Sequence, residues 1–164
     1  MGLQLPGELI SVLGELGYTW PEADEEKLFA LGNTWLQFGS ELASPLNQAQ
    51  ASAQQVWTAG QGPAVQAFQR VWSEGDSPAS NLGDAATAAT MVGAGLMVCA
   101  GIVLALKINV IVQLTMLVIE IAQAIATAVV TFGASLLEIP LFKEITQLII
   151  DQLLNMAIDK VLGG

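Results

Sequence analysis

The sequence predicts an all-α protein, a helical bundle built on a long antiparallel helical hairpin. Apolar residues recur every three or four positions over most of the 164 residues, which is the period of an amphipathic helix. Glycine and proline gather at a few points where helices would begin or end. Hydrophobic residues make up 53% of the chain and charged residues only 12%, whereas ordinary soluble domains carry about 25% charged residues. The helices must therefore cover one another or be covered by something else.

The first predicted helix is short and the second is long. Apolar residues at helical spacing predict a helix from Glu8 to Leu16, which Gly17 ends. A second helix should run from about Pro21 to Trp57, because proline suits a first helical turn and the carboxylates that follow complement the positive end of the helix dipole. Pro45 removes one backbone hydrogen bond from this helix, so we expect a kink or a short break there.

The clearest turn in the chain lies at Gly60-Gln61-Gly62-Pro63. Its two glycines can adopt positive φ and its proline can start the next helix, so we expect the chain to reverse there. The returning helix is short, carries Phe68 and Trp72 on its apolar side, and ends near Gly75. Residues 76–83 are rich in Ser, Pro, Asn and Gly, which predicts a loop.

The second half of the chain is very apolar. We expect Asp84 to cap a helix, and residues 85–106, which carry no charge, are long enough to cross a bilayer. Small residues repeat every fourth position at the start of this segment, a pattern that lets helices approach closely. From 107 to 137, polar residues recur at spacings of three, four or seven and predict one narrow polar stripe. Its members include Asn109, Gln113, Glu120, Gln123, Thr127 and Thr131.

This polar stripe has two interpretations, and the sequence leaves both open. It either faces solvent on the outside of a bundle or lines a wet lumen formed by several chains. Inside a bilayer the carboxylate of Glu120 would be costly and would mark a functional site. We expect Pro140 to end the apolar region and an amphipathic helix to follow over residues 140–164. The inner side chains of that helix would be Phe142, Ile145, Leu148, Ile149, Met156 and Ile158.

Charge and composition exclude several classes of function. The net charge is −10 and the five basic residues are scattered singly, so the clustered Lys and Arg that nucleic-acid phosphates require are missing. Histidine is absent and the one cysteine, Cys99, lies in an apolar run, which removes disulfides, the usual zinc sites and His-activated nucleophiles. The carboxylates lie in first turns, loops and amphipathic faces, where capping and solvation account for them. We therefore expect no enzyme, no catalytic residue, no cofactor, no metal and no small-molecule substrate.

The string from Val56 to Trp72 resembles the Trp-x-Gly (WXG) signature of type VII secretion substrates. In that family a Trp-Gly turn joins two antiparallel helices, and an aromatic residue follows on the second helix. The matching positions here are Trp57, Gly60, Gly62, Phe68 and Trp72. The segments Leu5 to Leu9, Gly17 to Asp24 and Ala122 to Ala128 resemble the WXG-like amino-terminal domain of large actinobacterial polymorphic toxins. The likeness covers almost the whole chain.

This resemblance implies one WXG-like domain over residues 1–164. Its parts would be a first helix and hairpin over 1–75, a loop over 76–83, an apolar helical region over 84–139 and an amphipathic helix over 140–164. The family implies a non-catalytic export module that is recognised as a folded helical bundle and normally precedes a C-terminal toxin domain. It also implies pairing with a small helical-hairpin protein or with a second copy, and contact with the type VII machinery.

The resemblance also implies a route out of the cell. Such a module is made in the cytoplasm and reaches the exterior or the cell envelope without a signal peptide. Residues 1–17 agree with this, because they lack a basic region and carry Glu8 and Glu15. Tyr18 and Glu22 match the Tyr-x-x-x-Asp/Glu export signal of the family.

Two questions of role remain open at this point. Trp57 and Phe68 either pin two helices together or are recognised by the export machinery, and both roles can coexist. The rival to an export module is a membrane-inserting or channel-forming protein, with residues 85–106 and 108–137 as a helical hairpin. Against the rival, the ends of these segments lack Trp and Tyr belts and basic anchors.

Overall fold

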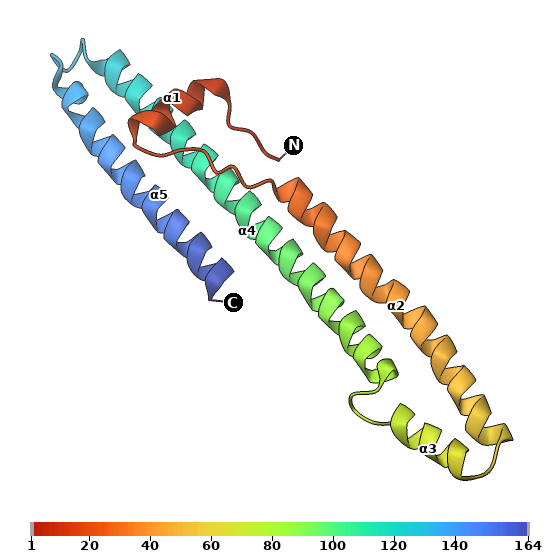
Figure 1. Ribbon diagram of the computed structural model, residues 1–164. Helices are drawn as coiled ribbons and strands as arrows, with labels where there is room; N and C mark the ends of the chain where they lie inside the picture. Colours follow the sequence, from red (N-terminus) through yellow and green to blue (C-terminus); the bar gives the residue numbers. More distant parts are fainter. Residues whose placement is uncertain (1, 164) are drawn as a thin grey trace. The chain divides into compact units, whose positions relative to one another are not determined.

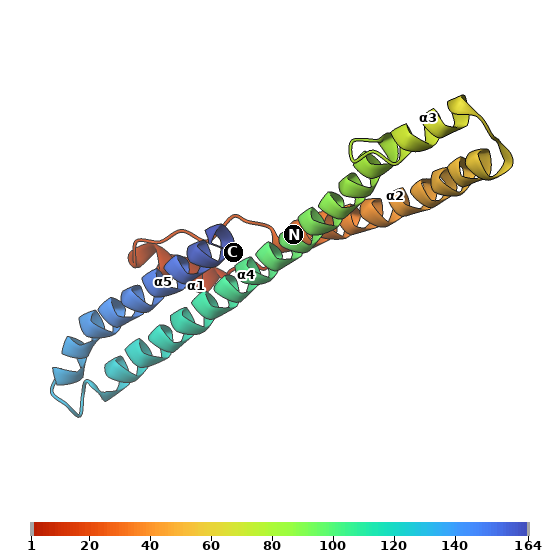
Figure 2. The same cartoon turned by 90° about the horizontal axis from the view of Figure 1, so that it is seen from below.

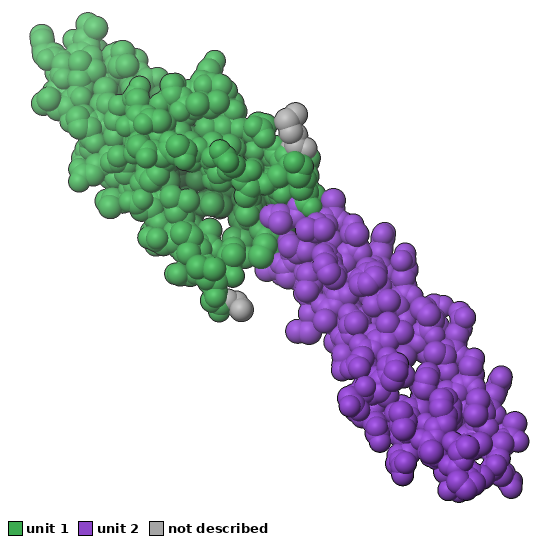
Figure 3. Space-filling view, viewed as in Figure 1, with its two compact units in different colours: residues 1–27, 99–164 green, residues 28–98 purple. Residues whose placement is uncertain are grey.

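The computed structural model describes residues 2–163, and the regular secondary structure within them is helical (Figure 1). The elements follow in the order α1 (Gly7–Glu15), α2 (Glu25–Ala59), α3 (Pro63–Trp72), α4 (Pro78–Thr127), the 3-10 helix η1 (Ala134–Glu138) and α5 (Ile139–Leu162). The all-α prediction is confirmed. The helices form two compact units (Figure 3). We call residues 28–98 the hairpin unit, and the described residues before 28 and after 98 the core unit.

In the hairpin unit, α2 and the first part of α4 lie side by side and run antiparallel (Figures 1 and 2). Their backbones approach closely at glycines. A Cβ atom placed on Gly93 would lie 2.8 Å from the carbonyl oxygen of Gly32, and one placed on Gly39 would lie 2.9 Å from that of Ala86. A larger residue at Gly93 or Gly39 would force the helices apart. The row of small residues therefore brings two helices of the same chain together.

Helix α2 begins later than the sequence predicts. Its first residue is Glu25 rather than Pro21, because Asp24 accepts a hydrogen bond from the backbone N–H of Lys27 at 3.1 Å, as a residue capping a helix does. The helix then continues through Pro45. Of the two expected outcomes there, a kink or a short break, the break is therefore wrong.

The predicted reversal at Gly60 to Pro63 is present, and Gly62 has a φ of +120°. The predicted loop over 76–83 is wrong, because α4 already begins at Pro78. Ser77 is buried and its hydroxyl accepts the backbone N–H of Ser80 at 3.2 Å, so Ser77 caps the helix and the proline fills its first turn. Asp84 consequently lies inside α4 and does not cap it.

Helix α4 is one continuous element of 50 residues. The predicted hairpin of residues 85–106 and 108–137 is therefore wrong, since the helix passes through residue 107 without a turn. The helix ends at Thr127, and the turn that follows contains Gly133 at positive φ. Pro140 does not end the apolar helix as predicted; it lies in the first turn of α5, where its missing N–H breaks no helical bond.

The core unit packs the last part of α4 against α1, α5 and the segment before α1. Its buried apolar residues are Leu5, Leu13, Leu16, Val110, Leu114, Leu117 and Ile150. Polar contacts tie α1 to α5. The side-chain amide of Gln147 donates to the carbonyl of Leu16 at 3.0 Å, and Lys143 lies 2.8 Å from the carboxylate of Glu15.

The predicted inner face of α5 is largely wrong. Phe142 and Ile149 are half-buried, but the fully buried positions are Thr146 and Ile150. Four side chains predicted to be inside are instead exposed: Ile145, Leu148, Met156 and Ile158. Because α5 carries apolar residues on more than one side, helical periodicity alone does not select the side that packs.

Candidate interaction site

Aromatic rings join α2 to α3 across the reversal. The rings of Trp57 and Phe68 have centroids 5.9 Å apart, and those of Phe68 and Trp72 lie 5.7 Å apart. The indole N–H of Trp72 donates to the side-chain oxygen of Gln50 at 3.2 Å. A Cβ atom on Gly60 would meet the carbonyl oxygen of Val56 at 2.8 Å. The structure thus brings together the three aromatic residues of the WXG-like turn, and their rings pack α2 against α3.

These aromatic residues are not fully buried by that packing. Phe68 keeps 37% of its surface exposed, and α3 buries none of its residues. Beside the rings lies a shallow groove of about 300 Å³, lined by Ala49, Ser52, Ala53, Val56, Phe68 and Trp72. A packing role therefore leaves a mainly apolar surface available at the same turn.

Tyr18 and Glu22 lie in the segment between α1 and α2. The hydroxyl of Tyr18 donates to the carboxylate of Asp151 at 2.7 Å and lies 3.1 Å from the carbonyl oxygen of Gln147. Burial, and then the hydrogen bond and charge of Asp151, raise the pKa of Tyr18 to about 12. Glu22 is exposed. Of the two residues that match the export signal, Tyr18 is therefore bonded to α5, whereas Glu22 remains exposed.

The predicted polar stripe on α4 lies at the surface of the core unit. Its exposed members are Asn109, Glu120, Gln123 and Thr127, while Gln113 is half-buried and Thr131 is exposed in the turn after the helix. The side chains of Asn109 and Thr127 bond back to the carbonyl oxygens of Ala105 and Gln123, one turn earlier. In the single chain the stripe faces outward.

Large apolar side chains share that outward side of α4. They are Ile108, Val112, Met116 and Ile119, at spacings of four, four and three, and we call these four residues the open face of α4. Their exposed fractions lie between 43% and 54%. Side chains of this kind on one helical stripe are typical of a surface that another helix covers.

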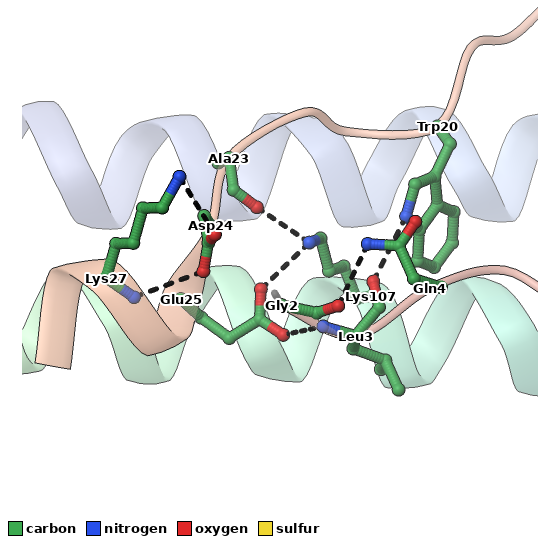
Figure 4. Close-up of polar contacts among 9 residues, drawn as sticks. All are labelled: Gly2, Leu3, Gln4, Trp20, Ala23, Asp24, Glu25, Lys27 and Lys107. Atoms are coloured by element: carbon green, nitrogen blue, oxygen red, sulfur yellow. Dashed lines mark hydrogen bonds and ion pairs between the residues drawn. The ribbon is translucent and has the colours of Figure 1, made fainter.

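Sequence reasoning missed an ion pair in the core unit (Figure 4). Lys107 is 2% exposed, and its Nζ atom lies 2.8 Å from Oε2 of Glu25 and 2.6 Å from the carbonyl oxygen of Ala23. It also lies 5.7 Å from the centre of the Trp20 ring. Leu3 donates its backbone N–H to the other oxygen of the same carboxylate. The one basic residue of α4 thus contacts the segment before α2 and the first residue of α2.

Opposing effects set the pKa of Glu25. Burial acts to raise it, but the hydrogen bond from Lys107, the backbone N–H of Leu3 and the positive charge of Lys107 outweigh burial, and the pKa lies below its usual value. The sequence did contain one signal for this ion pair, namely a single lysine in a long apolar segment. If such a segment is buried, its lysine requires a partner of opposite charge. Nothing in the sequence pointed to Glu25 among the four carboxylates at the start of α2.

Helix α4 meets the length and hydropathy of a membrane span, and no other helix in the described part of the chain does. Only 22% of its most apolar window is buried. The core helix of a soluble protein passes the same test of length and hydropathy but is mostly buried.

A comparison of this chain with models of known protein families assigns it to a family. Residues 5–147 match the WXG100 like domain. The chain belongs to the WXG100-like family. Comparison with curated proteins and with solved structures gave no match.

The match begins before α1 and ends within α5, so it covers the hairpin unit and part of the core unit. The family is one of helical proteins related to type VII secretion and is not typically enzymatic. Its members generally associate with helical partners and with the secretion machinery, and leave the cell without a signal peptide. The resemblance drawn from the WXG-like turn is confirmed at the level of the family.

Proposed function

We propose that this WXG100-like chain is the non-catalytic export module of a type VII secretion substrate, and that it pairs with a small helical-hairpin protein through the open face of α4. The observation that carries the proposal is the set of four large apolar side chains left about half exposed on one helical stripe. Members of the family generally associate with helical partner proteins. The alternative partner is a second copy of the chain.

Covering the open face would contribute appreciably to binding. Fully burying a large aliphatic side chain stabilises by about 1.5–3 kcal/mol. The four residues are about half exposed, so covering them would contribute about 3–6 kcal/mol before the entropy of association is subtracted. Only Glu120 brings a charge to the exposed side of this part of α4, so a partner helix can approach with little desolvation of charge.

The machinery would recognise the folded chain rather than a linear signal. Tyr18 supports this part of the proposal, because its hydroxyl is bonded to α5 instead of lying in a free tail. Phe68 and the groove beside it supply a second surface for recognition at the aromatic turn. We further propose that the whole of residues 1–164 acts as one module, which the match over 5–147 supports.

The proposal places a toxin domain after this module. The support is the likeness of Gly17 to Asp24 and Ala122 to Ala128 to the amino-terminal domain of actinobacterial polymorphic toxins. One of these is the mycobacterial channel protein that carries a necrotizing toxin. The module would be made in the cytoplasm and delivered to the exterior or the cell envelope.

The pairing can be tested by co-expressing the chain with each small helical-hairpin protein encoded next to its own gene. The molar mass of the purified complex is then measured by light scattering. We expect the wild-type chain to form a complex and the double variant V112D/M116D on the open face to lose it. The matched control is I145D/L148D, which places the same charges on exposed apolar positions of α5 and should keep the complex. Retention by the first variant, loss by both, or the lack of any complex with the wild type would refute the proposed pairing.

A second candidate function is insertion into a membrane. One observation favours it, namely the low burial of the only described helix that could span a bilayer. Purification without detergent separates the two candidates. A discrete, highly helical species in buffer favours the export module, whereas strict dependence on detergent, with a label at Val118 reporting acyl-chain surroundings, favours insertion.

A further inference from the structure

The most exposed apolar side chains of the described chain gather at the turn between α4 and α5. Five large apolar residues are at least 80% exposed: Val129, Val130, Phe132, Leu137 and Leu162. The first four lie within residues 128–137, which we call the apolar tip, and Phe132 is 100% exposed. Exposed apolar side chains that gather in one patch are typical of an interaction site.

The backbone of the apolar tip is strained at Phe132, the residue whose ring is fully exposed. Phe132 has a φ of +53° and is the only described residue other than glycine with a positive φ. This conformation is unfavourable for a residue with a side chain. The ring gains no contact in return, since it is fully exposed. Strain that persists without an internal gain is a pointer to function.

Several polar groups of the apolar tip form hydrogen bonds within the chain. The hydroxyl of Ser135 donates to the carbonyl of Ala124 at 2.7 Å, and the hydroxyl of Thr131 lies 3.0 Å from that of Ser135. Gly133 donates its backbone N–H to Ala128 at 2.7 Å. Further backbone N–H groups that donate within the tip or to the end of α4 are those of Ala128, Val130, Thr131, Ala134 and Leu136. These internal bonds reduce the number of polar groups that would lose water if the tip entered hydrocarbon.

The charged residues near the apolar tip limit the depth to which the tip can insert into a bilayer. They also limit the kind of lipid headgroup that it can approach. No charged residue lies between Glu120 and Glu138. Since a helix rises about 1.5 Å per residue, Glu120 lies about 10 Å along α4 from the end of the helix at Thr127. Interfacial segments enter a bilayer by about 5–10 Å, so the tip can enter without carrying Glu120 into hydrocarbon. The exposed carboxylate of Glu138 borders the tip and disfavours anionic headgroups.

We propose that the apolar tip inserts shallowly into a zwitterionic lipid bilayer, while α4 and α5 stay folded outside the hydrocarbon. A turn that presents separate apolar side chains fits a fluid acyl-chain surface, whereas a protein would have to offer a matching cavity. The inference does not depend on the export proposal, and it differs from membrane insertion of α4 because no helix spans the bilayer.

The test is co-flotation of the purified chain with phosphatidylcholine vesicles, scored as a partition coefficient. Phe132→Gly removes only the ring, at a position where the backbone favours glycine, and should lower the partition coefficient about tenfold. The variant V130D/F132D should abolish flotation. The matched control is L162D, which places a charge at an equally exposed apolar position at the other end of α5 and should float as the wild type does. Far-UV circular dichroism confirms that each variant remains helical.

Wild-type flotation should be insensitive to salt on phosphatidylcholine and weaker on phosphatidylglycerol at low salt, because the chain carries a net charge of −10. Each of three results overturns the proposal: a wild-type chain that does not float, a tip variant that floats as well as the wild type, or an equal loss in L162D. If the tip variants change only the sedimentation of the lipid-free chain, the tip joins two copies and the lipid assignment is wrong. Export can fail or succeed independently of all these results.

Discussion

Lys107 and Glu25 lie 82 positions apart in the sequence and form an ion pair of 2.8 Å, with side chains 2% and 4% exposed. The pair fastens the first residue of α2 to the middle of α4 within the core unit. A buried charge that loses its partner is costly, whereas a pair replaced by apolar groups of similar volume is not. The pair therefore makes the stability of the core unit sensitive to either residue alone.

Lys107→Met should destabilise the chain by about 3–5 kcal/mol, because it leaves the carboxylate of Glu25 buried without its partner. The double variant K107M/E25L should recover most of that loss, since neither charge remains. Chemical unfolding of the wild type, K107M, E25L and the double variant, followed by circular dichroism, gives four free energies, and the double-mutant cycle gives the coupling. Additive losses would show that the two side chains do not interact.

Acid should weaken the fold through Glu25. Its pKa in the folded chain lies below the usual value of 4.5, so the unfolded chain takes up its proton at a higher pH than the folded chain does. Stability from this group is therefore present above pH 4.5 and is lost as the pH falls through the folded pKa. Urea titrations at several pH values give the free energy of unfolding. Below pH 4.5 this free energy should fall less steeply in E25Q than in the wild type. Equal slopes would contradict the assignment.

Alkali should weaken the fold through Tyr18. Its pKa is raised from 10.0 to about 12 in the folded chain, so the unfolded chain ionises first as the pH rises. The stability from the neutral phenol is complete below pH 10.0 and disappears as the pH approaches 12. The quantity to measure is the difference in unfolding free energy between the wild type and Y18F. We expect this difference to shrink between pH 10 and 12; a constant difference would speak against the bond to Asp151.

Two glycines of α4 should respond in opposite directions to alanine. A Cβ atom on Gly95 meets nothing within 4 Å, so G95A should stabilise the helix by about 0.5–1 kcal/mol. A Cβ atom on Gly93 would lie 2.8 Å from the carbonyl oxygen of Gly32 and 2.9 Å from Cγ of Leu36. G93A should therefore destabilise the hairpin unit by about 1–3 kcal/mol. Thermal unfolding of the two variants compares them directly, and equal effects would mean that the backbones of α2 and α4 do not touch at Gly93.

Phe132→Gly should make the lipid-free chain more stable by about 1 kcal/mol, because glycine adopts positive φ without penalty and the exposed ring contributes no packing. Unfolding by urea measures this gain. Phe132→Ala keeps a side chain at the strained position and should give no comparable gain. A loss of stability in Phe132→Gly would show that the ring packs against the chain.

The sequence predicts the parts of this fold that local chemistry determines. The reversal at Gly60 to Pro63 is right because glycine and proline act on their own backbone, whatever packs around them. The start of α4 was missed because Ser77 caps the helix one residue before Pro78, and a loop-like composition over 76–83 concealed this pattern. Local signals that overlap in a short stretch cannot be ranked without the structure.

The features of the fold that the sequence does not predict depend on contacts between distant segments. Helix α5 is apolar on more than one side, so periodicity placed Leu148 inside although it is 64% exposed. Lys107 finds a partner 82 positions away, which no spacing rule encodes. The residues of the aromatic turn were found in the sequence, whereas the open face of α4 required knowledge of which side of that helix is covered.

The central claim is that this WXG100-like chain directs export through the type VII machinery. The most direct measurement fuses a reporter enzyme after Gly164 and compares its activity in the culture filtrates of two actinobacterial strains that differ only in the type VII ATPase. The account predicts reporter in the filtrate of the strain with the ATPase, none without it, and a large loss for V112D/M116D in the competent strain. Equal reporter in both filtrates, or reporter confined to the cells of both strains, would contradict it.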